Sequence, residues 1–96
     1  MSNSLYEEMV TECALALKSN TEVIEMVKMN SLSNCKSYIG WHFRNIALAS
    51  FCDRLEYSVS TNNTQLEEEL CSLVQAHGDR LEVKITTEAL ERAFNS

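Results

Sequence analysis

The sequence contains no proline and only two glycines, Gly40 and Gly78. Because residues that interrupt helices are so scarce, any helices must be delimited mainly by polar caps and by Ser/Asn/Thr clusters. The chain also lacks a run of about 18 apolar residues, the least that a membrane-spanning helix needs. We therefore expect a mostly helical protein with no membrane contact.

Targeting signals are also missing from the sequence. The segment from Met1 to Ser4 has neither the positive region nor the apolar region of a secretory signal, so we expect a cytoplasmic protein. At 96 residues the chain is long enough for one hydrophobic core, which predicts a single helical domain over residues 1–96.

The four cysteines do not form a metal-binding or disulfide pattern. Cys13, Cys35, Cys52 and Cys71 are well separated, and none belongs to a Cys-x-x-Cys or Cys-x-x-His pair. We expect four buried, reduced thiols that act as small apolar side chains. Disulfide pairing, or a zinc site assembled from different helices, remains as an alternative.

Motifs of catalysis are absent as well. The sequence has no Gly-rich phosphate loop, no nucleophile-elbow serine and no His-Glu-x-x-His pair. Its carboxylates, such as Glu67, Glu68 and Glu69, fall on expected helix starts or exposed helix faces. We therefore predict no enzymatic activity, no cofactor and no metal.

Positive charge is in short supply, and it is unevenly distributed. Fourteen acidic residues face eight basic ones, for a net charge of −6. Residues 1–30 sum to −3, residues 31–63 to +1 and residues 64–96 to −4. Because nucleic-acid affinity depends largely on Lys and Arg contacts to phosphates, a nucleic-acid partner is not expected. A basic protein partner would suit this charge better.

Three capping-box sequences predict helix starts. They are Ser4-Leu-Tyr-Glu7, Ser19-Asn-Thr-Glu22 and Thr64-Gln-Leu-Glu67. Apolar residues at helical spacing follow each box, which predicts a helix over about 4–18, a short helix from the Ser19 box to about Asn30, and a helix from the Thr64 box to Gly78. Gly78 should end the last of these with a left-handed cap.

Between Asn34 and Ser58 only Gly40 interrupts a helical pattern, so this segment predicts one long central helix of roughly 37 Å. Its apolar residues form two flanks rather than one. One flank has Cys35, Ile39, Phe43, Ile46, Ser50 and Tyr57. The other has Trp41, Leu48, Phe51, Cys52, Leu55 and Val59. Helices should therefore pack on both flanks, unless one flank is a subunit interface.

The segment from Leu81 to Ile85 alternates apolar and charged residues, which is typical of a strand. It has no second strand to pair with. Three interpretations stay open: an extended segment over the core, a strand pairing with its copy in a homodimer, or a helix. We favour the extended segment, followed by a short helix capped at Thr86 or Thr87. The predicted fold is all-α, with four to five helices around the long central one.

One cluster of aromatic, cationic and amide residues indicates a binding surface. Its members are Lys36, Tyr38, Trp41, His42, Arg44 and Asn45. Tyr, Trp and Arg are enriched at interface hot spots because they combine large buried area with a polar group. A helix-turn-helix reading of this region is disfavoured, since Ile39, Phe43 and Ile46 need a core.

These observations predict a non-enzymatic protein that binds another protein as regulator, adaptor or inhibitor. Many phage-encoded inhibitors are also short and acidic, an analogy of size and charge alone. The alternative is a small oligomeric module that binds a nucleotide or anionic metabolite through Tyr38, His42, Arg44 and Asn45.

Overall fold

The structure, a computed structural model, describes residues 4–95. It contains six α-helices and one short 3₁₀ turn over Gly78–Arg80. The helices are α1 (Ser4–Lys18), α2 (Thr21–Asn30), α3 (Leu32–His42), α4 (Arg44–Ser60), α5 (Thr64–His77) and α6 (Leu81–Phe94). The all-α prediction is confirmed, because the described chain contains no strand.

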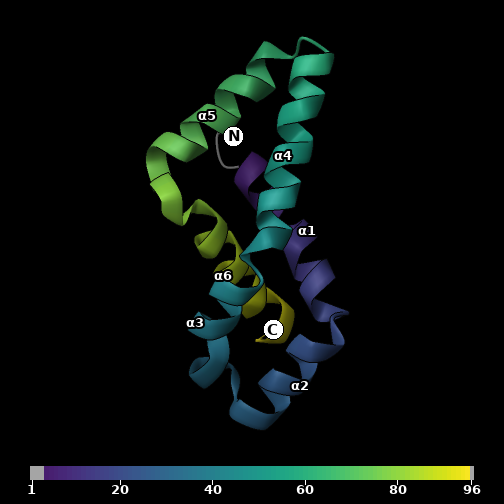
Figure 1. Cartoon of the computed structure of the whole chain (residues 1–96), viewed down its shortest axis with the longest axis vertical. Coiled ribbons are helices and arrows are strands. Elements are labelled where there is room, and N and C mark those ends of the chain that lie inside the picture. The colour runs from purple at the N-terminus through teal and green to yellow at the C-terminus, as the bar shows by residue number, and fades with distance from the viewer. Residues whose placement is uncertain (1–3, 96) are drawn as a thin grey trace.

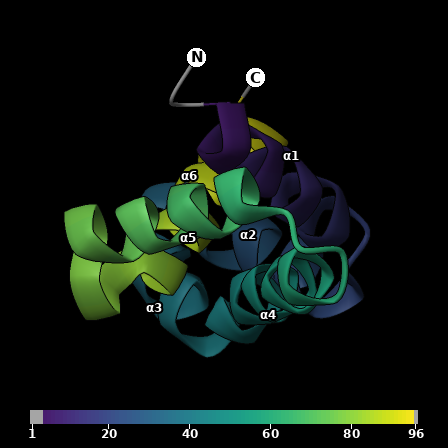
Figure 2. The ribbon, with the colours of Figure 1, turned by 90° about the horizontal axis from the view of Figure 1, so that it is seen from above.

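The last helix, α6, is the hub of the fold. It contacts α1, α3, α4 and α5, and it buries five residues, Leu81, Ile85, Thr86, Ala89 and Leu90. The molecule measures 45 × 22 × 22 Å; α4 and α5 meet at one end of the long axis, and α2 and α3 fill the other (Figure 1). Seen from the first end, α5 passes in front of α6 (Figure 2).

The prediction of one long helix from Asn34 to Ser58 is wrong. The helix ends at His42, and a new helix begins at Arg44. Between them Phe43 has φ −109° and ψ 18°, and its carbonyl accepts from the Ile46 amide at 3.2 Å rather than continuing the α-helical pattern. Because both α3 and α4 contact α6, the break lets each helix pack along the hub separately.

The two predicted apolar flanks of residues 34–58 differ in how far other helices bury them. On the first flank Cys35 and Ile39 are buried, whereas most of the second flank stays exposed. Its exposed members are Trp41, Leu48, Cys52, Leu55 and Val59. Helices thus cover only one flank, and α6 rather than the 34–58 segment is the axis of the fold.

The extended segment predicted over Leu81–Ile85 is also wrong, since these residues form the first turns of α6. An isolated strand would leave its backbone groups unpaired, whereas a helix satisfies them internally. The alternating pattern arises because α6 is covered on more than one side. Leu81 and Ile85 are buried one turn apart, and Val83 faces α3 beside Gly40. Thr86 is an interior helical residue, whose hydroxyl donates to the Glu82 carbonyl, and caps nothing.

Two helix starts are shifted by one residue from the predicted caps. Asn20, not Ser19, caps α2 by accepting from the Val23 amide at 3.1 Å. Asn63, not Thr64, caps α5 by accepting from the Leu66 amide at 3.1 Å. The side chain of Ser4, the third predicted cap, lies outside the described part of the chain.

Gly78 ends α5 as predicted, with φ 63°. Its ψ of −145° lies outside the left-handed helical region, in a conformation that essentially only glycine adopts.

The expectation of four buried thiols holds for two of them. Cys13 and Cys35 are buried, whereas Cys52 and Cys71 are exposed, and all four are free. The exposed pair lies on sides of α4 and α5 that no other helix covers.

Candidate functional site

Four residues of the predicted cluster form two contacting pairs on the surface at the α3–α4 junction. The rings of Tyr38 and His42 have centroids 4.0 Å apart and planes tilted by 36°. The Arg44 guanidinium carbon lies 3.7 Å from the centre of the Trp41 ring, and its Nη1 donates to the Trp41 carbonyl at 2.7 Å. Trp41 is 55% exposed and Tyr38 is 51% exposed. The larger aromatic rings of the cluster therefore face outward.

The other two members of the cluster lie differently. Lys36 is half-buried, and its Nζ pairs with Glu91 of α6 at 2.6 Å, so this cation holds α3 to α6. Asn45 is exposed in the first turn of α4. We call the four exposed residues, Tyr38, Trp41, His42 and Asn45, together with the half-buried Arg44 the aromatic patch.

An apolar groove lies beside the aromatic patch, where α4, α5 and α6 come together. It encloses about 380 Å³. Most of its lining is apolar, and the two charged groups in it are both carboxylates. The lining residues are Met9, Ala47, Leu48, Phe51, Val74, Gly78, Asp79, Leu81, Glu82 and Ile85. Its floor is the hydrophobic core itself, because Met9, Ala47 and Ile85 are fully buried.

The groove continues along α4 as an exposed apolar strip. Positions 44, 48, 55 and 59 share one side of a helix, so Arg44 begins the side on which Leu48, Leu55 and Val59 follow. Leu48 is 40% exposed and Val59 is 61% exposed. Across the groove Val74 of α5 is 44% exposed.

Sequence reasoning noted this strip only as the second flank of a helix expected to be covered. The groove walls from α5 and α6 were not foreseen. Leu81 and Glu82 belong to the segment that the sequence predicts as extended.

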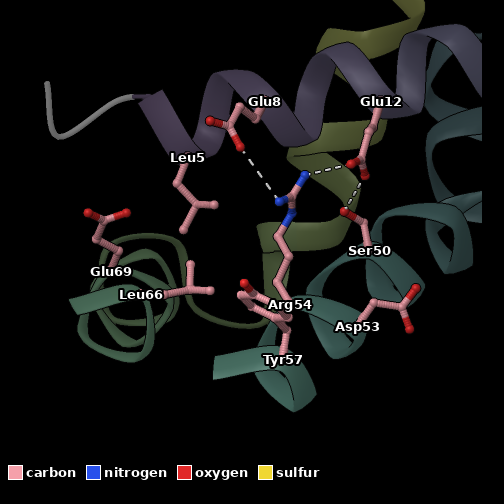
Figure 3. Close-up of a pocket in the computed structure, with 9 residues that line it drawn as sticks. All are labelled: Leu5, Glu8, Glu12, Ser50, Asp53, Arg54, Tyr57, Leu66 and Glu69. Atoms are coloured by element: carbon pink, nitrogen blue, oxygen red, sulfur yellow. Dashed lines mark hydrogen bonds and ion pairs between the residues drawn. The ribbon is translucent and has the colours of Figure 1, made fainter. Parts of the chain in front are cut away.

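A second, acidic hollow lies on another side of α4, where α1, α4 and α5 meet (Figure 3). It encloses about 370 Å³. Four carboxylates and one guanidinium line it, together with Leu5, Ser50, Tyr57 and Leu66. The charged groups are Glu8, Glu12, Asp53, Glu69 and Arg54.

Arg54 connects α4 to α1 in this hollow. Its Nη2 donates to Glu12 at 2.6 Å, its Nη1 lies 3.6 Å from Glu8, and Ser50 donates to Glu12 at 2.9 Å. In Figure 3 the guanidinium rises between the two α1 carboxylates, while Asp53 points away from it. Arg54 Nε is buried without a hydrogen-bond acceptor. The hollow thus contains an intramolecular ion-pair network at the surface that connects α1 and α4.

Two kinds of feature are absent from residues 4–95. No group of three or more His, Cys, Asp or Glu side chains is placed to hold a metal ion. None of the described helices is both long and apolar enough to cross a membrane.

The aromatic patch, the apolar groove and the acidic hollow all include residues of α4, which makes this helix the main contributor to the exposed features of the molecule.

No protein-family model matches this chain, and no similar protein was found among curated proteins or solved structures.

Proposed function

We propose that this chain is a non-enzymatic protein that binds another protein as a regulator, adaptor or inhibitor, with the aromatic patch in the contact surface. The observation that carries the proposal is the exposure of Trp41 beneath a stacked Arg44. A large ring held in place by a guanidinium contributes binding area at low entropic cost, because little freedom is left to lose on association.

The make-up of the aromatic patch supports a protein partner over a nucleotide. His42 already lies against Tyr38, with the two rings tilted by 36°, and Arg44 lies over one face of Trp41. Those are the stacking faces and the cation that a nucleotide base and its phosphate would need. The outward ring surfaces that remain suit a broad contact in which Trp, Tyr and Arg dominate the binding energy.

The experiment is affinity isolation from a native lysate, followed by mass spectrometry, with the wild-type chain and with Trp41→Ala/Arg44→Ala. We expect specific partners of the wild type to be reduced by about tenfold or more with the double variant, as for hot-spot residues. Tyr57→Ala is the matched control, because Tyr57 is exposed to a similar extent as Trp41 and lies on a different side of α4 from Arg44.

Identical partners for the double variant and the wild type would contradict the role of the aromatic patch. A thermal-shift screen against nucleotides and anionic metabolites tests the competing function. A ligand present at about 100 times its dissociation constant stabilises the folded state by about 2.7 kcal/mol. A shift of that size, lost in the double variant, would favour the small-ligand module.

A further inference from the structure

We infer that the apolar groove between α4, α5 and α6 is a docking site for an amphipathic helix of a partner protein, and that this helix carries basic residues beside its apolar stripe. The inference rests on the proposed protein-binding function, but it concerns a different surface and names the chemistry of the partner.

The shape of the exposed apolar surface indicates a helix as the occupant. From Leu48 to Val59 the apolar strip on α4 extends about 16 Å, roughly three helical turns. In the groove, opposite Leu48 and Phe51, Val74 of α5 and Leu81 of α6 form a second wall over a floor of buried core. A helix laid between two helices buries a stripe of that length through residues at i, i+3, i+4 and i+7.

The charges of the groove indicate a basic occupant. Asp79 and Glu82 line it, and no cation does. Glu82 is half-buried, and neither carboxylate has an ion-pair partner within residues 4–95. Glu67 lies on the same side of α5 as Val74, seven residues earlier. Lysine or arginine beside the apolar stripe of the occupant would pair with these carboxylates as the groove loses water.

A second copy of this chain fits the groove less well. Each copy carries a net charge of −6, and the wall that a copy would offer contains the same unpaired carboxylates. Self-association would therefore bring like charges together at an apolar contact, which opposes binding.

Two synthetic peptides test the inference with the full chain. The Lys peptide has about 18 residues, leucines at i, i+3, i+4 and i+7, lysines beside them and no tryptophan. The Glu peptide replaces every lysine with glutamate. Binding is followed by anisotropy of the labelled peptide and by emission of Trp41, the single tryptophan of the chain, which contacts Arg44, one turn before Leu48 on α4.

We expect the Lys peptide to bind at least about tenfold more tightly than the Glu peptide at low salt, with a smaller ratio at high salt. Leu48→Gln/Val74→Gln should weaken the Lys peptide by at least about tenfold, because it removes apolar contact area without adding charge. Leu15→Gln/Met29→Gln is the matched control, since both residues are highly exposed and neither lines the groove.

Asp79→Asn/Glu82→Gln should reduce the preference for the Lys peptide to about threefold or less. The control Glu22→Gln/Glu25→Gln changes the net charge equally on α2 and should keep the full preference. Circular dichroism of every variant checks that the helices are intact.

Three results would overturn the inference. Equal binding of the two peptides would mean that the occupant need not be basic. A wild-type dimer that Leu48→Gln/Val74→Gln dissociates in sedimentation would make the occupant a second copy. Failure of both peptides to bind would mean that the groove does not accept a helix. In each case the lysate experiment with Trp41→Ala/Arg44→Ala still tests the proposed function by itself.

Discussion

At the scale of single residues, the contact between Gly40 and Thr87 shows how closely α3 approaches the hub. A Cβ atom at position 40 would lie 2.6 Å from Thr87 Oγ1 and 3.8 Å from Val83 Cγ1. Glycine within a helix costs about 1 kcal/mol relative to alanine. The close approach of α3 and α6 explains why glycine is nevertheless found here.

We expect Gly40→Ala to lower the free energy of unfolding by about 1–2 kcal/mol, because overpacking outweighs the gain in helix propensity. Thr87→Ala removes the clashing hydroxyl, so Gly40→Ala/Thr87→Ala should recover most of the loss. Urea unfolding of the four chains forms a double-mutant cycle that isolates the contact. An increase in stability from Gly40→Ala alone would show that the two helices separate easily.

The Cys13 thiol links burial to pH. Burial first, and the nearby Glu12 second, raise the pKa of Cys13 from 9.0 to about 11. The folded state therefore keeps its thiol protonated in a pH range where the unfolded chain has already lost that proton. This contribution to stability is complete below pH 9 and is lost as the pH rises towards 11.

We expect the free energy of unfolding to fall by about 2 kcal/mol between pH 9 and 11 because of this thiol. Tyr6 adds to the fall at higher pH, since burial and its hydrogen bond to Glu88 also raise the pKa of its hydroxyl. Urea midpoints measured across this range for the wild type and Cys13→Ala separate the two effects. Parallel profiles for the two chains would contradict the assignment to Cys13.

At the scale of elements, sequence patterns predicted those helices whose formation depends mainly on contacts between residues close together in the chain. Periodic apolar residues and polar caps predicted α1, α2 and α5 closely, because a helix start depends on residues within one turn of it. The break at Phe43 carries no such signal. It depends on the packing of α3 and α4 against α6, which is about 40 residues away in the sequence. The helical state of Leu81–Ile85 was missed for the same reason.

The shifted caps give a direct test of the helix starts. Asn20→Ala and Asn63→Ala should each lower the free energy of unfolding by about 1 kcal/mol, because each removes an acceptor for an otherwise unpaired amide. Ser19→Ala and Thr64→Ala, at the positions predicted from the sequence, should change it by less than about 0.5 kcal/mol. Thermal and urea unfolding of the four variants would decide between the two sets of caps, and the reverse ranking would support the capping boxes.

At the scale of the whole molecule, the candidate site was only half foreseeable. The aromatic patch lies within eight consecutive residues, so its members were identifiable from the local sequence. Of the six predicted residues, all but Lys36 belong to this patch. The groove has walls from three helices and a floor that includes Met9 of α1. A surface of this kind exists only after folding, and no local pattern indicates it.

The central place of α6 predicts a strong effect of truncation. A chain ending at Arg80 would lose the partner of α1, α3 and α4 together, and with it the ion pairs of Glu91 with Lys36 and of Arg92 with Glu7. We expect this chain to show no cooperative thermal transition by circular dichroism and little dispersion of its amide proton NMR signals. A sharp transition would mean that residues 1–80 form a core without the hub.

The position of α6 after the other described helices also affects synthesis on the ribosome. The buried side of α1, which includes Met9, Val10 and Leu17, packs mainly against this later helix. At about 5–20 residues per second, roughly 4–15 seconds pass between the completion of α1 at Lys18 and that of α6 at Phe94. During that interval the apolar side of α1 is available to chaperones and proteases, so the efficiency of folding in the cell depends on how fast the ribosome reaches Phe94.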